Sequence, residues 1–165
     1  MNKIKIICVG NGDSSYPGNF AKKERDLINK NTFGRVLHLF SGRSLIGDVR
    51  IDFSTKEATI NDDVFNYLVN CEEKFETVIL DPPYNDIFAK KYQKIGNTPN
   101  QFIVFANSKK TTELFNLIRE KIDPSKIIIK SWNYYVPKGY EDIGSYLCYA
   151  GGYRKSTILM ICNKK

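Results

Sequence analysis

Residues 77–85, with the sequence TVILDPPYN, decide how the rest of the chain is interpreted. The first four are apolar or β-branched, as in a buried strand of a parallel sheet, and they run directly into Asp81-Pro82-Pro83-Tyr84. Each proline lacks an N–H and has a fixed φ, so the backbone after Asp81 has to leave the sheet in a stiff, extended turn. A carboxylate, a carbonyl and an aromatic ring therefore stand together at the carboxyl end of a strand, where open α/β sheets bind ligands.

This tetrapeptide resembles the catalytic motif of the S-adenosylmethionine-dependent amino-group methyltransferases that modify adenine N6 or cytosine N4 in DNA, and of some RNA guanine-N2 enzymes. The resemblance implies that the catalytic residues are Asp81, Pro82, Pro83 and Tyr84. An exocyclic amine is a poor nucleophile because its lone pair is delocalised into the ring, so it needs acceptors for its N–H groups and a ring stacked on the base. Asp81 and the Pro82 carbonyl suit the first need, and Tyr84 suits the second. The alternative is a strand capped by a rigid turn that carries a surface tyrosine.

Composition places the chain among globular proteins with a basic surface. Its 165 residues predict one domain, residues 1–165, and 42% hydrophobic and 13% aromatic content are enough to build a core. The net charge of +7 favours a polyanionic partner such as nucleic acid, although an ordinary solvated surface can carry the same excess.

Metal and membrane chemistry are not expected. The four cysteines contain no CxxC pair, and His38 has no partner at ligand spacing, so no metal site is predicted. Three of the cysteines sit in or beside apolar runs, and we interpret these as reduced packing residues of an intracellular, cytoplasmic protein. No apolar run approaches the roughly 20 residues of a membrane span, and no secretory signal is recognisable.

The segment before the central motif suggests a cofactor site. Residues 36–40, VLHLF, predict a strand that leads into Ser41 and Gly42. This Phe-Ser-Gly sequence resembles the F-x-G cofactor motif of the same methyltransferases, in which glycine lets the backbone approach the methionine part of the ligand. Asp81 lies 39 residues after Gly42, at the corresponding end of another strand.

The chain then departs from the usual methyltransferase pattern. Residues 49–53 predict the next strand, but its Asp52 comes only ten positions after Gly42, so residues 43–48 are too few for the customary helix. Either a loop has replaced that helix, or the fold assignment is wrong at this point. We favour the loop, because Asp52 would still stand where a carboxylate can accept both ribose hydroxyls of the cofactor.

Further candidate ligand residues follow a short strand predicted at 57–60. Asn61 and Asp62 are interpreted as helix caps, which is compatible with a contact to the adenine of the cofactor. The resemblance thus implies a cofactor site made of Phe40, Ser41, Gly42, Asp52, Asn61, Asp62 and Asp81.

Two basic and aromatic segments are candidates for nucleic-acid contact. Residues 85–100 predict a movable lid, and residues 132–153 hold seven aromatic side chains beside cations. The alternative for the aromatic segment is packing on the core or a dimer surface. The expected contact residues are Tyr84, Lys90, Lys91, Lys94, Trp132, Lys138, Arg154 and Lys155.

The remaining pattern completes an α/β fold. Strands are predicted at 3–9, 101–107, 126–135 and 156–162, with helices at 20–30, after Asp63, and from Thr111 or Thr112 to the residue before Pro124. We therefore expect a Rossmann-like class I methyltransferase sheet, mostly parallel with an antiparallel C-terminal strand, and helices on both faces.

The function implied by the resemblance is methylation of an exocyclic amine, with adenine N6 in DNA favoured because Asp rather than Ser opens the motif. RNA guanine-N2 methylation is one alternative, and a non-catalytic module that binds nucleic acid or a partner is another. No segment is long enough for a separate target-recognition domain. Specificity would then be slight, or come from a partner or a homodimer, or from the aromatic segment.

Overall fold

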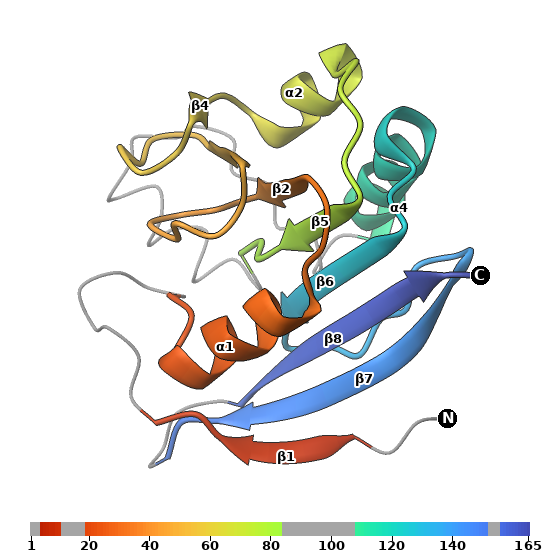
Figure 1. The fold of residues 1–165 in the computed structure, drawn as a ribbon. Helices are drawn as coiled ribbons and strands as arrows, with labels where there is room; N and C mark the ends of the chain where they lie inside the picture. The colour runs from red at the N-terminus through yellow and green to blue at the C-terminus, as the bar shows by residue number, and fades with distance from the viewer. Residues whose placement is uncertain (1–3, 11–18, 84–107, 152–155) are drawn as a thin grey trace.

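The computed structural model describes residues 4–10, 19–83, 108–151 and 156–165. In these residues, eight strands form one sheet in the order β1-β7-β8-β6-β5-β2-β3-β4 (Figure 1). The strands are β1 (Lys5–Cys8), β2 (Val36–Leu39), β3 (Val49–Asp52), β4 (Ile60–Asn61), β5 (Thr77–Leu80), β6 (Lys126–Ser131), β7 (Tyr140–Tyr149) and β8 (Thr157–Lys164). The helices are α1 (Lys22–Asn31), α2 (Val64–Asn70) and α4 (Ser108–Leu117), which continues into a π-helical turn, η1 (Ile118–Ile122).

Strand direction follows the expected pattern. β8 runs antiparallel to both of its neighbours, β6 and β7, whereas the other described strand pairs are parallel. In Figure 1, β8 lies between the two strands that precede it in the chain. The prediction of a mostly parallel sheet with an antiparallel C-terminal strand is confirmed.

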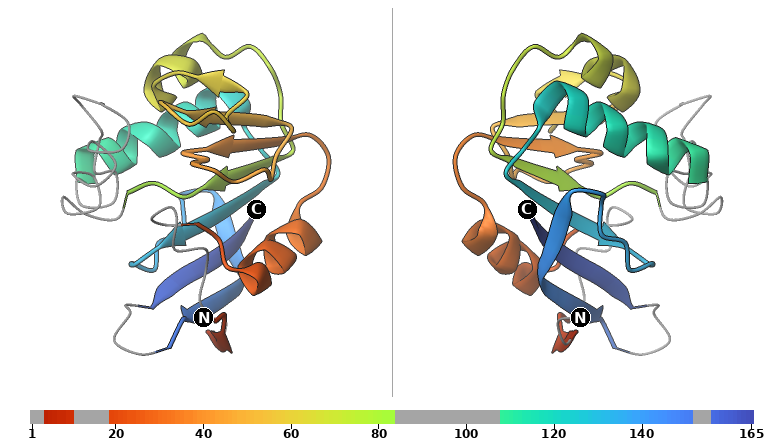
Figure 2. Two further views of the ribbon diagram at one scale, coloured as in Figure 1. Left: turned by 90° about the vertical axis from the view of Figure 1, so that its left-hand side faces the viewer. Right: turned by 90° about the vertical axis from the view of Figure 1, so that its right-hand side faces the viewer.

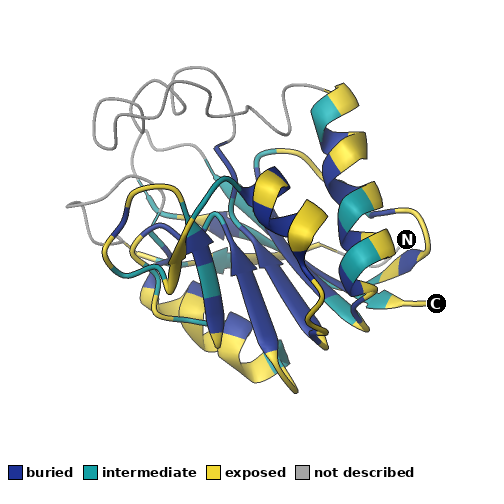
Figure 3. Ribbon diagram, turned by 90° about the horizontal axis from the view of Figure 1, so that it is seen from above, coloured by how far each residue is buried: buried dark blue, intermediate teal, exposed yellow. Residues whose placement is uncertain are grey.

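Alternating strand residues build a separate core on each face of the sheet. Leu37, Val78 and Ile127 belong to a cluster that packs against α2, α4 and η1. Their neighbours along the strands point the other way, so Ile79 and Ile128 pack with the residues of α1. Figure 2 shows α1 and α4 on opposite sides of the sheet, and Figure 3 shows the buried strands between the helices. The expectation of helices on both faces is confirmed.

A loop connects β2 to β3, as the sequence predicted. The backbone N–H of Asp48 donates to the carbonyl of Val36 at 2.9 Å, and the Val36 N–H donates to the Asp48 carboxylate at 2.7 Å. The imidazole Nδ1 of His38 lies 2.9 Å from the Ile46 carbonyl, which can only accept, so the ring is held as the Nδ1–H tautomer. The loop is therefore fixed to the face of β2 that also carries α1.

A buried ion pair that the sequence did not reveal anchors the start of α1. The Lys130 ammonium of β6 lies 3.1 Å from the Glu24 carboxylate, and both side chains are about 95% buried. The same carboxylate accepts the N–H of Ala21 at 2.7 Å, and the ammonium lies 4.9 Å from the centre of the Phe20 ring. Glu24 is therefore a buried charge on a helix whose exposed face carries the basic residues Lys22, Lys23 and Lys30.

Several element boundaries differ from the predictions. The strand predicted at 57–60 is limited to Ile60–Asn61, and α4 begins at Ser108, so neither Thr111 nor Thr112 is its N-cap. The strand predicted at 126–135 ends at Ser131, because the chain bends where the Asn133 N–H donates to the Ser131 hydroxyl at 3.0 Å. The predicted strand at 101–107 and the predicted lid at 85–100 lie outside the described residues.

In the part of the chain that the structure describes, none of the helices has the length and apolar character that crossing a membrane requires.

Candidate functional site

The carboxyl ends of four parallel strands meet at one edge of the sheet. Leu39 of β2 pairs with Ile51 of β3 on one side and with Leu80 of β5 on the other. The chain passes from β2 to β3 on one side and reaches β5 on the other, so the strand order reverses beside β2. Such a reversal is where open α/β sheets bind their ligands. The residues that follow these strands therefore form the candidate site.

The turn after β2 has an unusual backbone. Phe40 has a φ of 59°, in the left-handed region that non-glycine residues seldom adopt, and Gly42 has a φ of 52°. The Ser41 N–H donates to the carbonyl of Ile51 at 3.0 Å, which ties the turn to β3. The side chain of Phe40 packs against the core beneath α2 and α4. Strained residues held in this way are common at ligand sites.

Ser41 carries a buried hydroxyl that forms no hydrogen bond with the residues that the structure describes. The residue is 5% exposed, and its hydroxyl has no hydrogen-bond partner among the described residues. A buried hydroxyl without a partner costs free energy, so such an atom at a strand end is a place where a ligand's polar group can bind.

Asp52 lies at the end of β3, as predicted, but its carboxylate is largely occupied by the protein. One oxygen accepts the N–H of Gly42 at 3.0 Å, and the other accepts those of Ser54 and Thr55, each at 3.2 Å. A carboxylate offers about four acceptor positions, so about one remains free. Accepting both ribose hydroxyls needs two, and that predicted role is therefore restricted to one hydroxyl unless the turn rearranges.

The residues after β3 and β4 form a connected turn. The Asn61 side-chain amide donates to the carbonyls of Asp52 at 3.2 Å and Thr55 at 2.9 Å. Asp63 caps α2, since its carboxylate accepts the N–H groups of Phe65 and Asn66.

Asp62 lies in front of the same helix and has a structural contact of its own. Its carboxylate accepts the Asn66 side-chain amide at 2.9 Å and the Asp63 N–H at 2.8 Å. The N-cap of α2 is thus Asp63, and Asn61 and Asp62 hold the turn that precedes it. Adenine contacts from Asn61 and Asp62 stay a prediction.

The central motif occupies the expected place. Asp81 directly follows β5 and is half-buried, and its N–H points toward the Leu39 carbonyl at 3.5 Å. Pro82 and Pro83 are buried, so the turn is packed into the protein. Tyr84, the fourth residue of the motif, lies outside the described residues.

The structure separates two of the predicted nucleic-acid contacts. Trp132 directly follows β6, the neighbour of β5, and so lies at the same edge as Asp81. Lys138 precedes β7, which runs parallel to β6, and its neighbour Gly139 accepts the N–H of Lys165 at the opposite edge. Lys138 therefore does not join the candidate site. Lys90, Lys91, Lys94, Arg154 and Lys155 lie outside the described residues.

Much of the aromatic segment packs on the protein itself. Tyr135 stacks on Phe115 of α4 at 5.0 Å between ring centres. Tyr140 is 5% exposed, burial raises its pKa to about 12, and its hydroxyl donates to the Pro124 carbonyl. Tyr146 packs against the core under α1. These residues favour the packing alternative, whereas Tyr134 and Tyr149 remain 42% and 43% exposed.

Three of the four cysteines are buried, whereas Cys8 is exposed. Cys71, Cys148 and Cys162 are buried and free, and burial raises the pKa of Cys148 and Cys162 to about 12. The thiols of Cys148 and Cys162 are therefore poor nucleophiles at neutral pH. No cluster of three His, Cys, Asp or Glu residues suited to a metal ion occurs within the described ranges.

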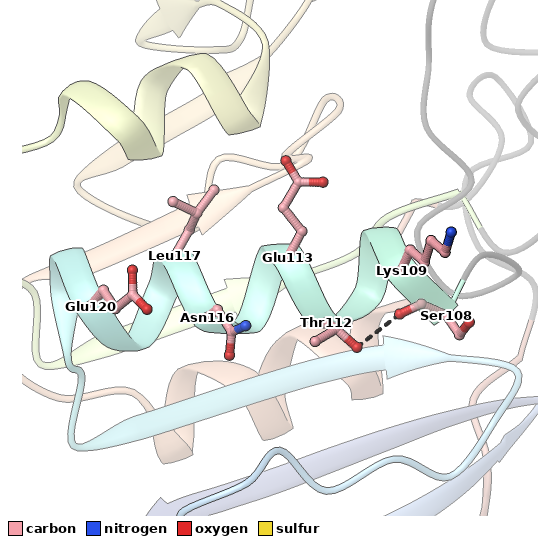
Figure 4. A pocket seen from close by; sticks show the side chains of 7 residues that line it. All are labelled: Ser108, Lys109, Thr112, Glu113, Asn116, Leu117 and Glu120. Atoms are coloured by element: carbon pink, nitrogen blue, oxygen red, sulfur yellow. Dashed lines mark hydrogen bonds between the residues drawn. The ribbon is translucent and has the colours of Figure 1, made fainter.

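An open hollow of about 600 Å³ runs along α4 (Figure 4). The described residues that line it all belong to α4 and η1, and none of them follows a strand of the sheet. The lining residues are Ser108, Lys109, Thr112, Glu113, Asn116, Leu117 and Glu120. The Thr112 hydroxyl donates to the Ser108 carbonyl, a bond internal to the helix.

Comparison with known proteins identifies the fold. No family model matches the sequence, and no curated protein matches it. Among solved structures, the Escherichia coli protein YhhF, described as a methyltransferase, matches with a TM-score of 0.55 at 11% identity, over 93% of this chain and 90% of its own. The fold is therefore the Rossmann-like fold of methyltransferases.

Two further structures are similar at lower scores. The Haemophilus influenzae protein HI0767, described as a methylase, has a TM-score of 0.49 at 12% identity, over 86% of this chain and 93% of its own. The Pyrococcus abyssi tRNA (uracil-54, C5)-methyltransferase, solved with S-adenosyl-L-homocysteine, has a TM-score of 0.48 at 16% identity. That match covers 91% of this chain and 40% of the Pyrococcus enzyme.

Proposed function

We propose that this protein is an S-adenosylmethionine-dependent methyltransferase that acts on an exocyclic amine of a nucleobase, with adenine N6 in DNA as the favoured target. One observation carries the proposal: the Asp81-Pro82-Pro83 turn follows β5 directly beside the Phe40-Ser41-Gly42 turn that follows β2. A proposed acceptor for the amine and a proposed cofactor loop thus share one strand-end edge. The fold of YhhF, a protein described as a methyltransferase, supports the same class of activity.

The cofactor half of the site suits a ligand with both polar and apolar parts. The buried hydroxyl of Ser41, which has no partner among the described residues, can bind a polar group of the cofactor. The remaining acceptor position of Asp52 can take one ribose hydroxyl. When bound, S-adenosylmethionine supplies an electrophilic methyl group on a sulfonium.

The catalytic half has to orient a weak nucleophile. The Asp81 carboxylate accepts one N–H of the target amine, and the Pro82 carbonyl accepts the other. Together they turn the nitrogen lone pair toward the methyl carbon, and Asp81 favours loss of the N–H proton as the new bond forms. A target in duplex DNA first has to leave the base stack, at a cost of about a few kcal/mol.

A non-catalytic module is the second candidate, and two observations favour it. The helix that usually follows the glycine motif is replaced by a loop, and the Asp52 carboxylate is already bound by three backbone N–H groups. In this case the chain would keep the sheet and bind nucleic acid or a partner without chemistry.

Calorimetry with S-adenosylhomocysteine and a transfer assay distinguish these candidates. We expect the parent to bind this product and to transfer labelled methyl from S-adenosylmethionine to adenine in DNA, identified by mass analysis of the nucleosides. Asp81→Ala should reduce turnover by about 10²- to 10⁴-fold, the usual range for a lost acid–base group, with little change in cofactor affinity. Tyr84→Phe is the control: it keeps the stacking ring and should retain much of the activity.

Three results would contradict the proposal in different ways. Full activity of Asp81→Ala would make the motif a structural turn. Label on guanine of RNA would select the guanine-N2 alternative. A parent that binds no cofactor would support the non-catalytic module.

A further inference from the structure

The Phe40-Ser41-Gly42 turn after β2 is not followed by the helix that is usual at this position, so other contacts must fix its shape. Gly42 is buried at a φ of 52°, and its conformation decides where the loop turns away from the sheet. The hydrogen bonds that the structure gives for Gly42 come from the turn after β3.

Both polar backbone groups of Gly42 are held by that neighbouring turn. The N–H donates to the Asp52 carboxylate at 3.0 Å, and the carbonyl accepts the hydroxyl of Thr55 at 2.6 Å. Asp52 in turn accepts the N–H of Thr55, so the two side chains form one connected clamp around a single residue. With its N–H engaged in this way, Gly42 has no backbone donor left for a ligand.

Thr55 is built into this arrangement and not exposed on the surface. It is 8% exposed, and its own carbonyl accepts the side-chain amide of Asn61 at 2.9 Å, which connects the clamp to the end of β4. Nothing in the sequence motifs singled this residue out, because its role depends on where the β3 turn meets the β2 turn.

We propose that Thr55 is a positioning residue that, together with Asp52, clamps Gly42 from the β3 turn and so takes over the role of the missing helix. Its importance for ligand binding rests on the proposed function. The orientation of Gly42 does not depend on that function and can be measured without ligand.

The test compares Thr55→Val, which keeps the shape and loses the hydroxyl, with Thr55→Ser, which restores it. In protein labelled with ¹⁵N-glycine, the amide of Gly42 should shift and exchange faster with solvent in Thr55→Val, and return toward the parent in Thr55→Ser. Affinity for S-adenosylhomocysteine, measured by calorimetry, should fall about tenfold in Thr55→Val and recover in Thr55→Ser.

Thr59→Val provides the matched control. The Thr59 hydroxyl also donates to a backbone carbonyl and accepts a backbone N–H, both of Arg50, but it does not contact Gly42. It should leave the Gly42 amide and the affinity unchanged. The amide of Gly144 in β7 should stay constant in all variants, which shows that the fold is intact.

The outcomes separate the inference from the proposed function. An unchanged Gly42 amide in Thr55→Val overturns the clamp, whereas a shifted amide with unchanged affinity overturns the role of the clamp in ligand binding. If the parent binds no S-adenosylhomocysteine, the proposed function fails, and the amide of Gly42 then decides the clamp by itself.

Discussion

His38 is a fully buried imidazole in the middle of β2, between the β2–β3 loop and the ring of Phe20, which stacks on it at 5.6 Å between ring centres. Burial is the main reason that its pKa falls to about 4, and the nearby Arg50 cation lowers it further. Its Nε2 has no hydrogen-bond partner among the described residues, so the ring has no acceptor that would favour a second proton.

Because the pKa of His38 is lowered in the folded state, we expect the protein to lose folding stability in mild acid. The pKa of His38 is about 6.5 when unfolded and about 4 when folded, so between these pH values only the unfolded state takes up the proton. The free energy of unfolding should therefore decrease as the pH is lowered through this window, by roughly 3 kcal/mol in total. Above the window, this histidine should not affect it. Urea unfolding at pH 7.5, 6, 5 and 4.5 measures the slope.

His38→Asn is the comparison, because its side-chain amide can keep the donor to the Ile46 carbonyl without titrating. The variant should show a shallower pH dependence, whatever its stability at pH 7.5. Parallel curves for parent and variant would show that His38 does not titrate as described.

Single residues also show which features of the site could be predicted from the sequence. The place of Asp52 and Asp81 at strand ends followed from the apolar runs before them. The partners of Asp52 did not, because the N–H groups it accepts belong to turns whose geometry residue types do not determine. The role of Thr55 could not be predicted for the same reason, because a single threonine indicates no function until its neighbours in space are known.

At the scale of elements, a buried ion pair joins α1 to the sheet in addition to its apolar contacts. Glu24 and Lys130 are 106 positions apart in sequence and meet in a buried environment between α1 and β6. Removing one member of such a pair leaves a charge without its partner, whereas removing both can be nearly neutral.

Lys130→Met should therefore destabilise the protein by about 3 to 5 kcal/mol. The double variant Glu24→Gln with Lys130→Met should recover most of this loss, since glutamine can still accept the N–H of Ala21. Chemical denaturation gives both values. Lys110→Ala is a control on the exposed pair with Glu113 and should cost less than about 1 kcal/mol. A single variant no less stable than the double one would refute this account of α1.

The elements also show which predictions depend on local sequence. The strands at 36–39 and 77–80 are continuous apolar runs, and the sequence identified both. The helix at Ser108 was placed too late because Thr111 and Thr112 resemble caps, while in the structure Thr111 is buried within the helix. Lys138 was assigned to the candidate site because sequence does not show that the chain returns to the opposite edge before β7.

For the whole molecule, the net charge of +7 predicts a salt-dependent affinity for nucleic acid. The logarithm of the binding constant should fall with the logarithm of salt concentration by about 0.9 per duplex phosphate neutralised, or about 0.7 for single strands. Fluorescence anisotropy with labelled oligonucleotides measures this slope.

Lys138→Ala should leave the slope unchanged, because this residue lies at the edge opposite Asp81. Replacing Lys90, Lys91 and Lys94 with alanine should reduce the slope, as their predicted phosphate contacts require. An affinity insensitive to salt would argue against a polyanionic substrate.

The position of β8 has a consequence for how the nascent chain assembles. β8 follows β7 in the chain but lies between β6 and β7, with Lys126 opposite Asn163 and Tyr146 opposite Leu159. Until residues 157–164 leave the ribosome, β7 and its partner β1 have no strand through which to join β6. Until then, the edges of β6 and β7 that pair with β8 stay open, and other chains can pair with them. Closing that gap is a late step built from contacts between distant residues, the kind that forms slowly.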